Sequence, residues 1–199
     1  MRQGNERFVS AAQGLDTLTG QRRRTALRTS QEPFAIVLGC SDSRVPAEIV
    51  FDQGPGDLFV IRVAGNIVAP SQIGSVEFAA ARFGTRLVVV LGHTNCGAVQ
   101  ATLEVLQRPT ESHSRNLRSI VDRIIPSVEG LMRTDLRHDI NALMKEAERA
   151  NVCASVNQLR HGSEIIEQMV QTEGLAVVGA EYSLETGVVE FFDGVLEPG

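Results

Sequence analysis

Five short apolar segments stand out in the hydrophobic pattern of the chain. Almost uninterrupted aliphatic runs are "FAIVLG" (34–39), "DLFVIRVAGN" (57–66) and "RLVVVLG" (86–92). Runs of this length and composition predict strands that are buried on both faces, as in a parallel sheet. Near the end of the chain come "LAVVGAEYS" (175–183) and "GVVEFF" (187–192), and the short "LET" between them predicts a hairpin.

Helical patterns separate most of these strands. We predict helices over residues 5–29, 71–83, 96–106, 116–131, 139–160 and 163–174. Gly84 and Gly174 are placed to end two of these helices, and Pro126 is expected to end or kink a third. The residues expected to face inward on the helix over 139–160 are Ile140, Leu143, Met144, Ala147, Val152, Val156 and Leu159.

The order of these elements predicts the fold class. Apolar strands separated by helices favour an α/β domain with a mainly parallel central β-sheet, mixed at one edge, and helices on both faces. The length suits a single domain over residues 1–199. Right-handed crossovers bring the carboxyl ends of the parallel strands to one side, where ligands of such sheets bind.

Composition and charge restrict the kinds of binding partner and the cellular location that we expect. The net charge is −5 and the pI about 5.4, which gives no reason to expect a nucleic-acid partner or an anionic membrane surface. The first residues lack the apolar core of a secretory signal, and no segment reaches the length of a membrane span. Three cysteines, an odd and small number, predict reduced thiols in a cytoplasmic protein.

Three metal-binding side chains follow two of the predicted strands. Cys40 comes directly after the first strand, and His93 and Cys96 come after the third. Because the carboxyl ends of parallel strands meet at one edge of a sheet, we expect the three to converge. Two thiolates and an imidazole suit Zn²⁺, and a helix beginning at Cys96 would favour its thiolate form. Three ligands leave the fourth position open, as in catalytic zinc sites.

Two further residues compete for that fourth position. Cys153 would add a thiolate, but its place on an apolar helix face favours a buried structural thiol. Asp42 is the other candidate, and a bidentate contact with Arg44 would hold it off the metal and keep it ionised. It could then accept a hydrogen bond from metal-bound water. The remaining histidines are interpreted as ordinary surface residues: His113, His138 and His161.

With these residues assembled, the chain resembles a β-class carbonic anhydrase. The matching segments are "CSDSRVPAEIVFDQGPGDLFVIRVAGNIV" (40–68) and "VVVLGHTNCGAV" (88–99). The resemblance implies the β-carbonic anhydrase fold, zinc bound by Cys40, His93 and Cys96, and a catalytic dyad of Asp42 and Arg44. It also implies reversible hydration of carbon dioxide to bicarbonate and a proton, by attack of a zinc-bound hydroxide that the dyad orients.

The resemblance extends to residues around the metal. Val37 stands where one branch of the family has a tryptophan, and the members in which the aspartate swings onto zinc belong to that branch. Gln31 matches a glutamine of the other branch, where it can donate a hydrogen bond to a substrate oxygen. We therefore expect the open type of site, with Asp42 off the metal.

The expected substrate pocket is apolar and is shared between subunits. Phe59 and Phe78 match positions that line it, and Gly97 is expected to bind substrate beside the second zinc cysteine. In the family the active-site cleft lies at a dimer interface, so a homodimer or homotetramer is implied. Residues 1–30 are expected to form a helical arm that packs on the partner subunit.

Two alternatives remain open from sequence. Hydrolases of carbon disulfide and carbonyl sulfide use the same zinc constellation, and one sequence does not separate them finely from a carbon dioxide hydratase. A non-catalytic zinc domain with a regulatory or assembly role is the second alternative. The presence of both dyad residues, Asp42 and Arg44, beside the three metal ligands speaks against it.

Overall fold

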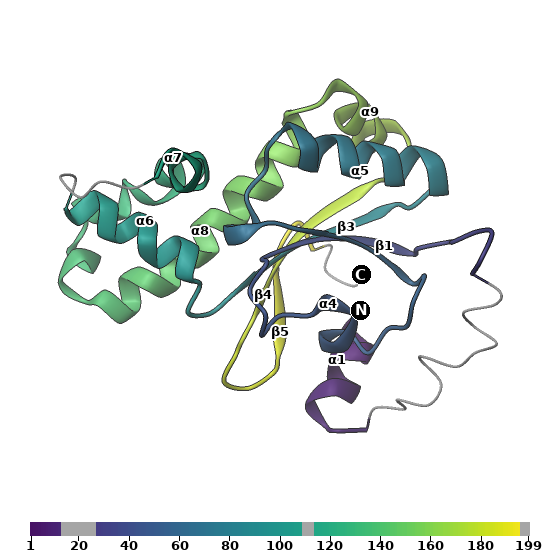
Figure 1. Cartoon of the computed structure of the whole chain (residues 1–199), viewed down its shortest axis with the longest axis horizontal. Coiled ribbons are helices and arrows are strands. Elements are labelled where there is room, and N and C mark those ends of the chain that lie inside the picture. Colours follow the sequence, from purple (N-terminus) through teal and green to yellow (C-terminus); the bar gives the residue numbers. More distant parts are fainter. Residues whose placement is uncertain (13–26, 109–113, 196–199) are drawn as a thin grey trace.

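The computed structural model describes residues 1–12, 27–108 and 114–195. Within them, one five-stranded sheet has the order β2-β1-β3-β4-β5 (Figure 1). Its strands are β1 (Ala35–Gly39), β2 (Leu58–Arg62), β3 (Leu87–His93), β4 (Ala176–Tyr182) and β5 (Val189–Asp193). All neighbouring pairs are parallel except β4 and β5, which are antiparallel. The predicted fold class, a mainly parallel sheet that is mixed at one edge, is confirmed.

Helices connect the strands at nearly the predicted places. The described α-helices are α1 (Arg2–Val9), α4 (Ala47–Val50), α5 (Pro70–Phe83), α6 (Gly97–Gln107), α7 (Arg115–Val128), α8 (Ile140–His161) and α9 (Glu164–Thr172). Short 3-10 turns are η1 (Ala64–Asn66), η2 (Leu131–Arg133) and η3 (Asp135–His138). Local sequence explains several of the ends. Asp139 and Ser163 cap α8 and α9 with their side chains, and Gly84 ends α5 in a left-handed conformation.

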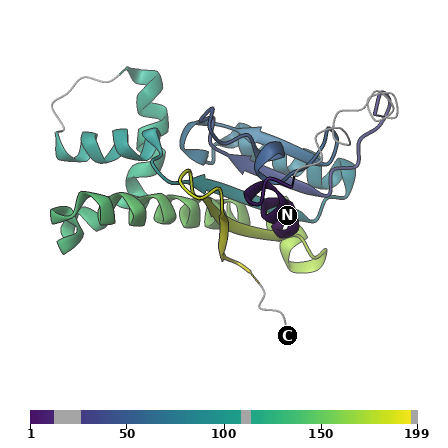
Figure 2. The same ribbon diagram turned by 90° about the horizontal axis from the view of Figure 1, so that it is seen from below.

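The two faces of the sheet are covered by different helices. One face packs against α5, α9 and the second half of α8, whereas α1 and α4 lie on the other (Figure 1). Side chains of β1 alternate between these two cores, as the pleat of a strand requires. A third core forms between α6, α7 and the first half of α8, which together project past one end of the sheet (Figure 2). Cys40 and Cys96 belong to this third core.

Two predicted elements differ from the structure, and part of a third lies outside the described residues. The single helix predicted over residues 5–29 is wrong, because α1 ends at Val9 and Ala11 is left-handed, with φ 55°. The second strand ends at Arg62 because Gly65 and Asn66 are also left-handed, with φ 70° and 43°. Residues 13–26, nearly half of the arm predicted over residues 1–30, lie outside the described residues.

Two predicted helix details also need correction. Ile140, expected to face the core, is 58% exposed because it is the first residue of α8, beyond the packed part of that helix. Pro126 does not end α7 at once but lies in its last turn, two residues before the end at Val128.

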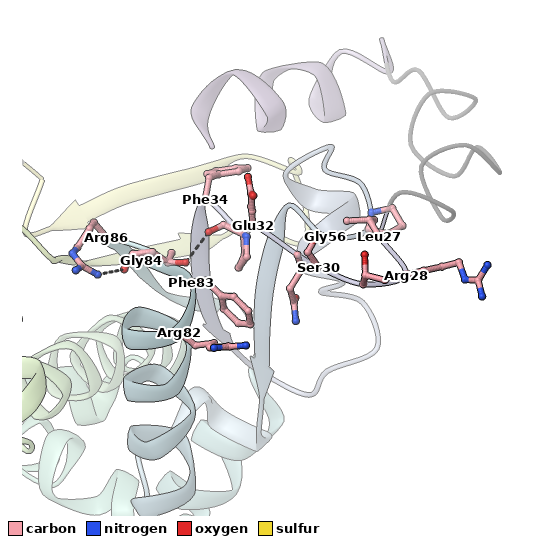
Figure 3. A pocket seen from close by; sticks show the side chains of 15 residues that line it. Leu27, Arg28, Ser30, Glu32, Phe34, Gly56, Arg82, Phe83, Gly84 and Arg86 are labelled. Carbon is pink, nitrogen blue, oxygen red and sulfur yellow. Dashed lines mark hydrogen bonds between the residues drawn. The ribbon is translucent and has the colours of Figure 1, made fainter.

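A pocket of about 970 Å³ lies at the opposite end of the sheet from Cys40 and Cys96 (Figure 3). It is lined by residues before β1, including Gln31 and Glu32, and by Arg82 and Phe83 at the end of α5. At the carboxyl end, the third core packs against the loops after β1 and β3.

Candidate metal centre

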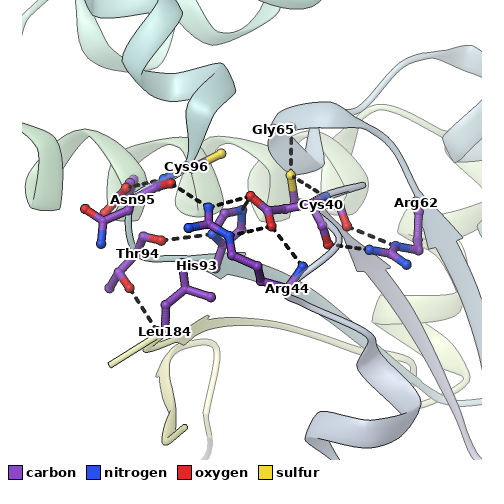
Figure 4. A network of polar contacts seen from close by, with 11 residues as sticks. Cys40, Arg44, Arg62, Gly65, His93, Thr94, Asn95, Cys96 and Leu184 are labelled. Carbon is purple, nitrogen blue, oxygen red and sulfur yellow. Dashed lines mark hydrogen bonds and ion pairs between the residues drawn. The ribbon is translucent and has the colours of Figure 1, made fainter. Parts of the chain in front are cut away.

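Three buried side chains meet at the carboxyl end of the sheet. Cys40 follows β1, His93 is the last residue of β3, and Cys96 is the N-cap of α6. Parallel pairing of β1 with β3 places these positions side by side, and the three ligand atoms lie within 4.8 Å of one another. The exposed fractions are 5%, 1% and 2%. The predicted convergence of the three residues is therefore confirmed (Figure 4).

The orientation of His93 suits a metal ligand. Its Nδ1 atom lies 3.0 Å from the carbonyl oxygen of Thr94. Because a carbonyl only accepts, Nδ1 carries the proton and Nε2 presents its lone pair. Nε2 is buried and has no hydrogen-bond partner among the described residues. A buried acceptor without a partner, facing two thiols, fits the place of a metal ion.

The two thiols influence each other strongly. The pKa of Cys40 is lowered to about 4, first by a hydrogen bond with Cys96 and then by His93 and the backbone N–H groups of Asp42 and Gly65, against the effect of burial. The pKa of Cys96 is raised by the same contact with Cys40 and by burial. The backbone N–H groups at the start of α6 lower the pKa of Cys96, which is the predicted direction, but their effect is smaller than those of Cys40 and of burial.

Asp42 and Arg44 form the predicted bidentate pair. Arg44 Nε donates to Asp42 Oδ1 at 2.9 Å, and a terminal guanidinium nitrogen donates to Oδ2 at 2.7 Å. The Arg44 backbone N–H donates to Oδ1 as well. These contacts hold the pKa of the Asp42 carboxyl well below its usual range. Oδ2 lies 3.9 Å from Nε2 of His93, so the carboxylate borders the metal position while both its oxygens are engaged by Arg44.

Two arginines tie the ligand loops together. Arg62, at the end of β2, donates to the carbonyl oxygens of Cys40 at 3.0 Å and Asp42 at 2.6 Å. Arg44 also donates to the carbonyl oxygen of Asn95, one residue before Cys96, at 3.3 Å. The loop after β1 is thus attached both to β2 and to the loop after β3.

The remaining predicted site residues divide into two groups. Gly97, the first residue of α6, directly follows Cys96 of the candidate metal cluster. Gln31 precedes β1 and lines the pocket at the amino end of the sheet. Phe59 and Phe78 contact each other, with ring centroids 6.2 Å apart, and Phe78 is 55% exposed. Within one chain Gln31 and the two phenylalanines are not brought to the metal cluster, and their substrate-binding role stays a prediction.

Cys153 does not take part in the cluster. It lies on α8, half-buried rather than fully buried, and burial together with the neighbouring Asp193 raises the pKa of its thiol. His138 and His161 are exposed, as predicted, and His113 lies outside the described residues.

Glu148, on α8, is a site residue that sequence reasoning missed. It is 4% exposed, and its Oε1 accepts the backbone N–H of Cys96 at 2.8 Å. Burial raises its pKa to about 7. The sequence feature that could have revealed Glu148 is its place next to Ala147, on the inward face of an amphipathic helix. A buried carboxylate there needs a hydrogen-bond partner.

Comparisons with known proteins point to one protein family. A family model described as Carbonic anhydrase matches residues 35–189. A carbonic anhydrase of Mycolicibacterium smegmatis is 43% identical over 195 residues, which cover 96% of this chain and 89% of that protein.

Solved structures share the fold. A β-carbonic anhydrase of the fungal pathogen Aspergillus fumigatus superimposes with a TM-score of 0.77 at 25% identity, over 89% of this chain and 83% of that one. Two β-carbonic anhydrases of Sordaria macrospora are described as tetrameric, and the match to them has a TM-score of 0.74 at 24% identity, over 85% of each chain. The family model, the identity over nearly the whole chain and the shared fold together show that this chain belongs to the β-class carbonic anhydrases.

Proposed function

We propose that this enzyme uses Zn²⁺ to catalyse the reversible hydration of carbon dioxide to bicarbonate and a proton. The observation that carries the proposal is the Asp42 carboxylate, which Arg44 holds with two hydrogen bonds at the border of a buried Cys–His–Cys cluster. Because Arg44 is exposed, the Asp42–Arg44 pair could form just as well facing solvent, so the fold does not require Asp42 to face the cluster. A water that reacts at the cluster and donates a hydrogen bond to Asp42 would explain this placement.

Cys40, His93 and Cys96 are the proposed zinc ligands. Two thiolates and one imidazole are a typical donor set for zinc with one open position. When bound, zinc lowers the pKa of a coordinated water, which supplies a nucleophile near neutral pH. Two anionic sulfur ligands reduce this effect relative to three neutral imidazoles, so we expect the activity to rise toward alkaline pH.

Asp42 orients the nucleophile in this proposal. Because its pKa is depressed, Asp42 stays ionised and accepts a hydrogen bond from the attacking water. Arg44 occupies both carboxylate oxygens and so keeps Asp42 from becoming the fourth metal ligand. We propose the open type of site on this ground.

The substrate side of the site is proposed to come partly from a second copy of the chain. Gly97 lies beside the metal within one chain, whereas Gln31, Phe59 and Phe78 lie away from it. An exposed phenylalanine such as Phe78 is typical of a surface that another subunit covers. We propose a homodimer or a homotetramer, and the tetrameric Sordaria proteins share the fold.

The proposed location is the cytoplasm, where three free thiols stay reduced. None of the helices in the described part of the chain is long and apolar enough to cross a membrane.

The test combines metal content with the rate of carbon dioxide hydration across pH. Purified wild-type protein is expected to contain about one zinc per chain and to hydrate carbon dioxide faster as pH rises. Asp42→Asn is expected to keep zinc and lose about 10²–10⁴-fold in rate, the range for a positioned proton acceptor. Zinc-loaded wild type without hydratase activity would contradict the proposal, and a structure with Asp42 as fourth ligand at neutral pH would contradict the open type of site.

A further inference from the structure

A buried polar stripe runs along the inner face of α8. It consists of Glu148, Asn151 and Ser155, whose exposed fractions are 4%, 2% and 4%. Their spacing places them on one side of the helix, between apolar residues of the first and third cores. Buried polar side chains in such surroundings are costly unless each has a specific partner.

Each member of the stripe has a backbone partner in a loop near the metal cluster. Glu148 Oε1 accepts the N–H of Cys96 at 2.8 Å. Asn151 Nδ2 donates to the carbonyl oxygen of Gly65 at 2.7 Å, and Ser155 Oγ donates to that of Asn66 at 3.0 Å. These bonds join residues that are 52, 86 and 89 positions apart in the chain. One helix therefore holds two separate loops.

The turn at Gly65 and Asn66 sets the position of the first sulfur. The Gly65 N–H donates to Sγ of Cys40 at 3.3 Å. Both turn residues have positive φ, which is strained for the asparagine, and a Cβ at Gly65 would lie 2.8 Å from Ile124 and 3.0 Å from Ala98. A strained turn of this kind persists only when its surroundings hold it, and Asn151 with Ser155 supply two of the contacts that do so.

The peptide unit between Asn95 and Cys96 is held from both sides. Its carbonyl accepts from Arg44 at 3.3 Å, and its N–H donates to Glu148 at 2.8 Å (Figure 4 shows the Arg44 side). Asn95 has a left-handed φ of 56°. The direction in which the Cys96 side chain leaves the backbone depends on the plane of this peptide, so Glu148 helps to set the position of the second sulfur.

We propose that Glu148, Asn151 and Ser155 are positioning residues that fix the two sulfur ligands from α8, a role that rests on the proposed zinc site. They touch neither the metal position nor the substrate and act through Cys96 and the turn at Gly65. The stripe explains why a helix far along the chain carries three buried polar residues in an otherwise apolar interface.

The decisive feature of Glu148 in this proposal is a hydrogen-bond acceptor at the Cys96 N–H. Glu148→Gln keeps an acceptor oxygen at nearly the same place, whereas Glu148→Ala removes it. Glu146→Ala is the matched control, because Glu146 is an exposed glutamate on the same helix.

The experiment measures zinc affinity by competition with a chelator, on the full chain of each variant, together with the thiolate-to-metal charge-transfer spectrum of the Co²⁺ form. Glu148→Ala is expected to bind zinc about 10–100-fold more weakly, the usual effect of losing a contact that orients a metal ligand. Its Co²⁺ spectrum is expected to shift. Glu148→Gln and Glu146→Ala are expected to bind zinc with nearly the wild-type affinity, because the first keeps an acceptor oxygen and the second changes an exposed residue away from Cys96.

A second variant guards against misfolding. Asn151→Asp has nearly the same shape but turns a donor toward the Gly65 carbonyl into an acceptor. It is expected to weaken zinc binding through Cys40 while circular dichroism shows the wild-type helix content.

The outcomes separate this inference from the proposed function. Wild type that binds neither zinc nor cobalt refutes both. Wild type that binds zinc, with folded Glu148→Ala and Asn151→Asp binding it equally well and with unchanged cobalt spectra, refutes the positioning role alone. Equal losses in Glu148→Ala and Glu148→Gln also refute it, since the acceptor would then not be what matters.

Discussion

The two ends of the central sheet differ in how tightly their loops are held and in how much of their side chains is exposed. At the carboxyl end, the loops after β1, β2 and β3 are tied to one another and to α8 by hydrogen bonds of Arg44, Arg62 and Glu148. The ligand side chains there are at most 5% exposed. At the amino end, Phe34 lines a pocket and is 45% exposed, and Phe78, which contacts the pocket residue Phe83, is 55% exposed.

The difference indicates which site is complete within one chain and which surface is suited to contact a second chain. The Cys–His–Cys cluster consists of residues of a single chain, and several buried polar contacts fix the loops that carry it. The aromatic cluster of Phe59, Phe78 and Phe83 packs tightly, with centroids 5.7–6.2 Å apart, yet presents an open side. An exposed aromatic group beside a pocket suits a subunit contact.

The largest expected effect is that of Cys40→Ser at the carboxyl end. A serine hydroxyl stays protonated near neutral pH and is a poor zinc ligand, so bound zinc should be lost and hydration should fall to the uncatalysed rate. Metal analysis and stopped-flow kinetics measure both. Cys153→Ser is the control, because that thiol lies beside Asp193 outside the cluster, and it should retain zinc and activity.

Arg44→Lys should have the next largest effect. A lysine offers a point charge in place of the two-pronged guanidinium, so Asp42 loses its bidentate partner and the Asn95 carbonyl loses its donor. We expect kcat to fall about 10–100-fold with zinc content unchanged. Arg82→Lys, an exposed arginine at the amino end, should leave kcat at the wild-type value; equal losses in both variants would remove the contrast between the two ends.

Phe78→Asp tests the amino end. Because Phe78 is 55% exposed within one chain but contacts the rings of Phe59 and Phe83, the free energy of unfolding of the isolated subunit should fall by about 1–3 kcal/mol. A buried carboxylate at a subunit contact is costly, so the assembly should dissociate. Size-exclusion chromatography with light scattering measures this, with Ile165→Asp, 51% exposed on α9, as the control. A monomeric wild type would contradict the predicted interface.

The smallest expected effect on the site is that of Thr85→Val. Thr85 is 3% exposed, and its hydroxyl donates to the carbonyl oxygen of Pro33 at 2.7 Å. Valine has a similar shape but leaves that carbonyl unpaired, which should cost about 1–3 kcal/mol of unfolding free energy. Denaturant unfolding measures the loss, while zinc affinity and kcat should be unchanged. A change in zinc affinity would show that the two ends are coupled.

Local pattern was sufficient to predict much of the fold and the convergence of the three candidate metal ligands. The aliphatic runs of β1 and β3 are buried on both faces, so their composition alone identifies them as strands of a parallel sheet. Since parallel strands end on the same side, Cys40, His93 and Cys96 could be brought together from sequence. The Asp42–Arg44 pair is equally local, because two residues of separation allow the contact without help from the rest of the chain.

Contacts between segments that are distant in the chain could not be predicted from the hydrophobic pattern. Helical periodicity marked α8 as amphipathic, but it did not show that Glu148 faces Cys96 or that Asn151 faces Gly65. Those partners depend on how α8 crosses the end of the sheet. The early end of α1 likewise depends on a left-handed residue, Ala11, which residue type does not reveal.

Sequence by itself therefore determined the mainly parallel fold class, the convergence of Cys40, His93 and Cys96, and the carboxylate–guanidinium pair, because periodicity and short-range geometry govern these features. Tertiary structure alone decided which buried polar groups hold the ligand loops, and that Gln31 and Phe78 lie away from the metal within one chain. The physical reason is that a buried hydrogen bond is specified by the packing of both partners, and neither partner carries that information in its own segment.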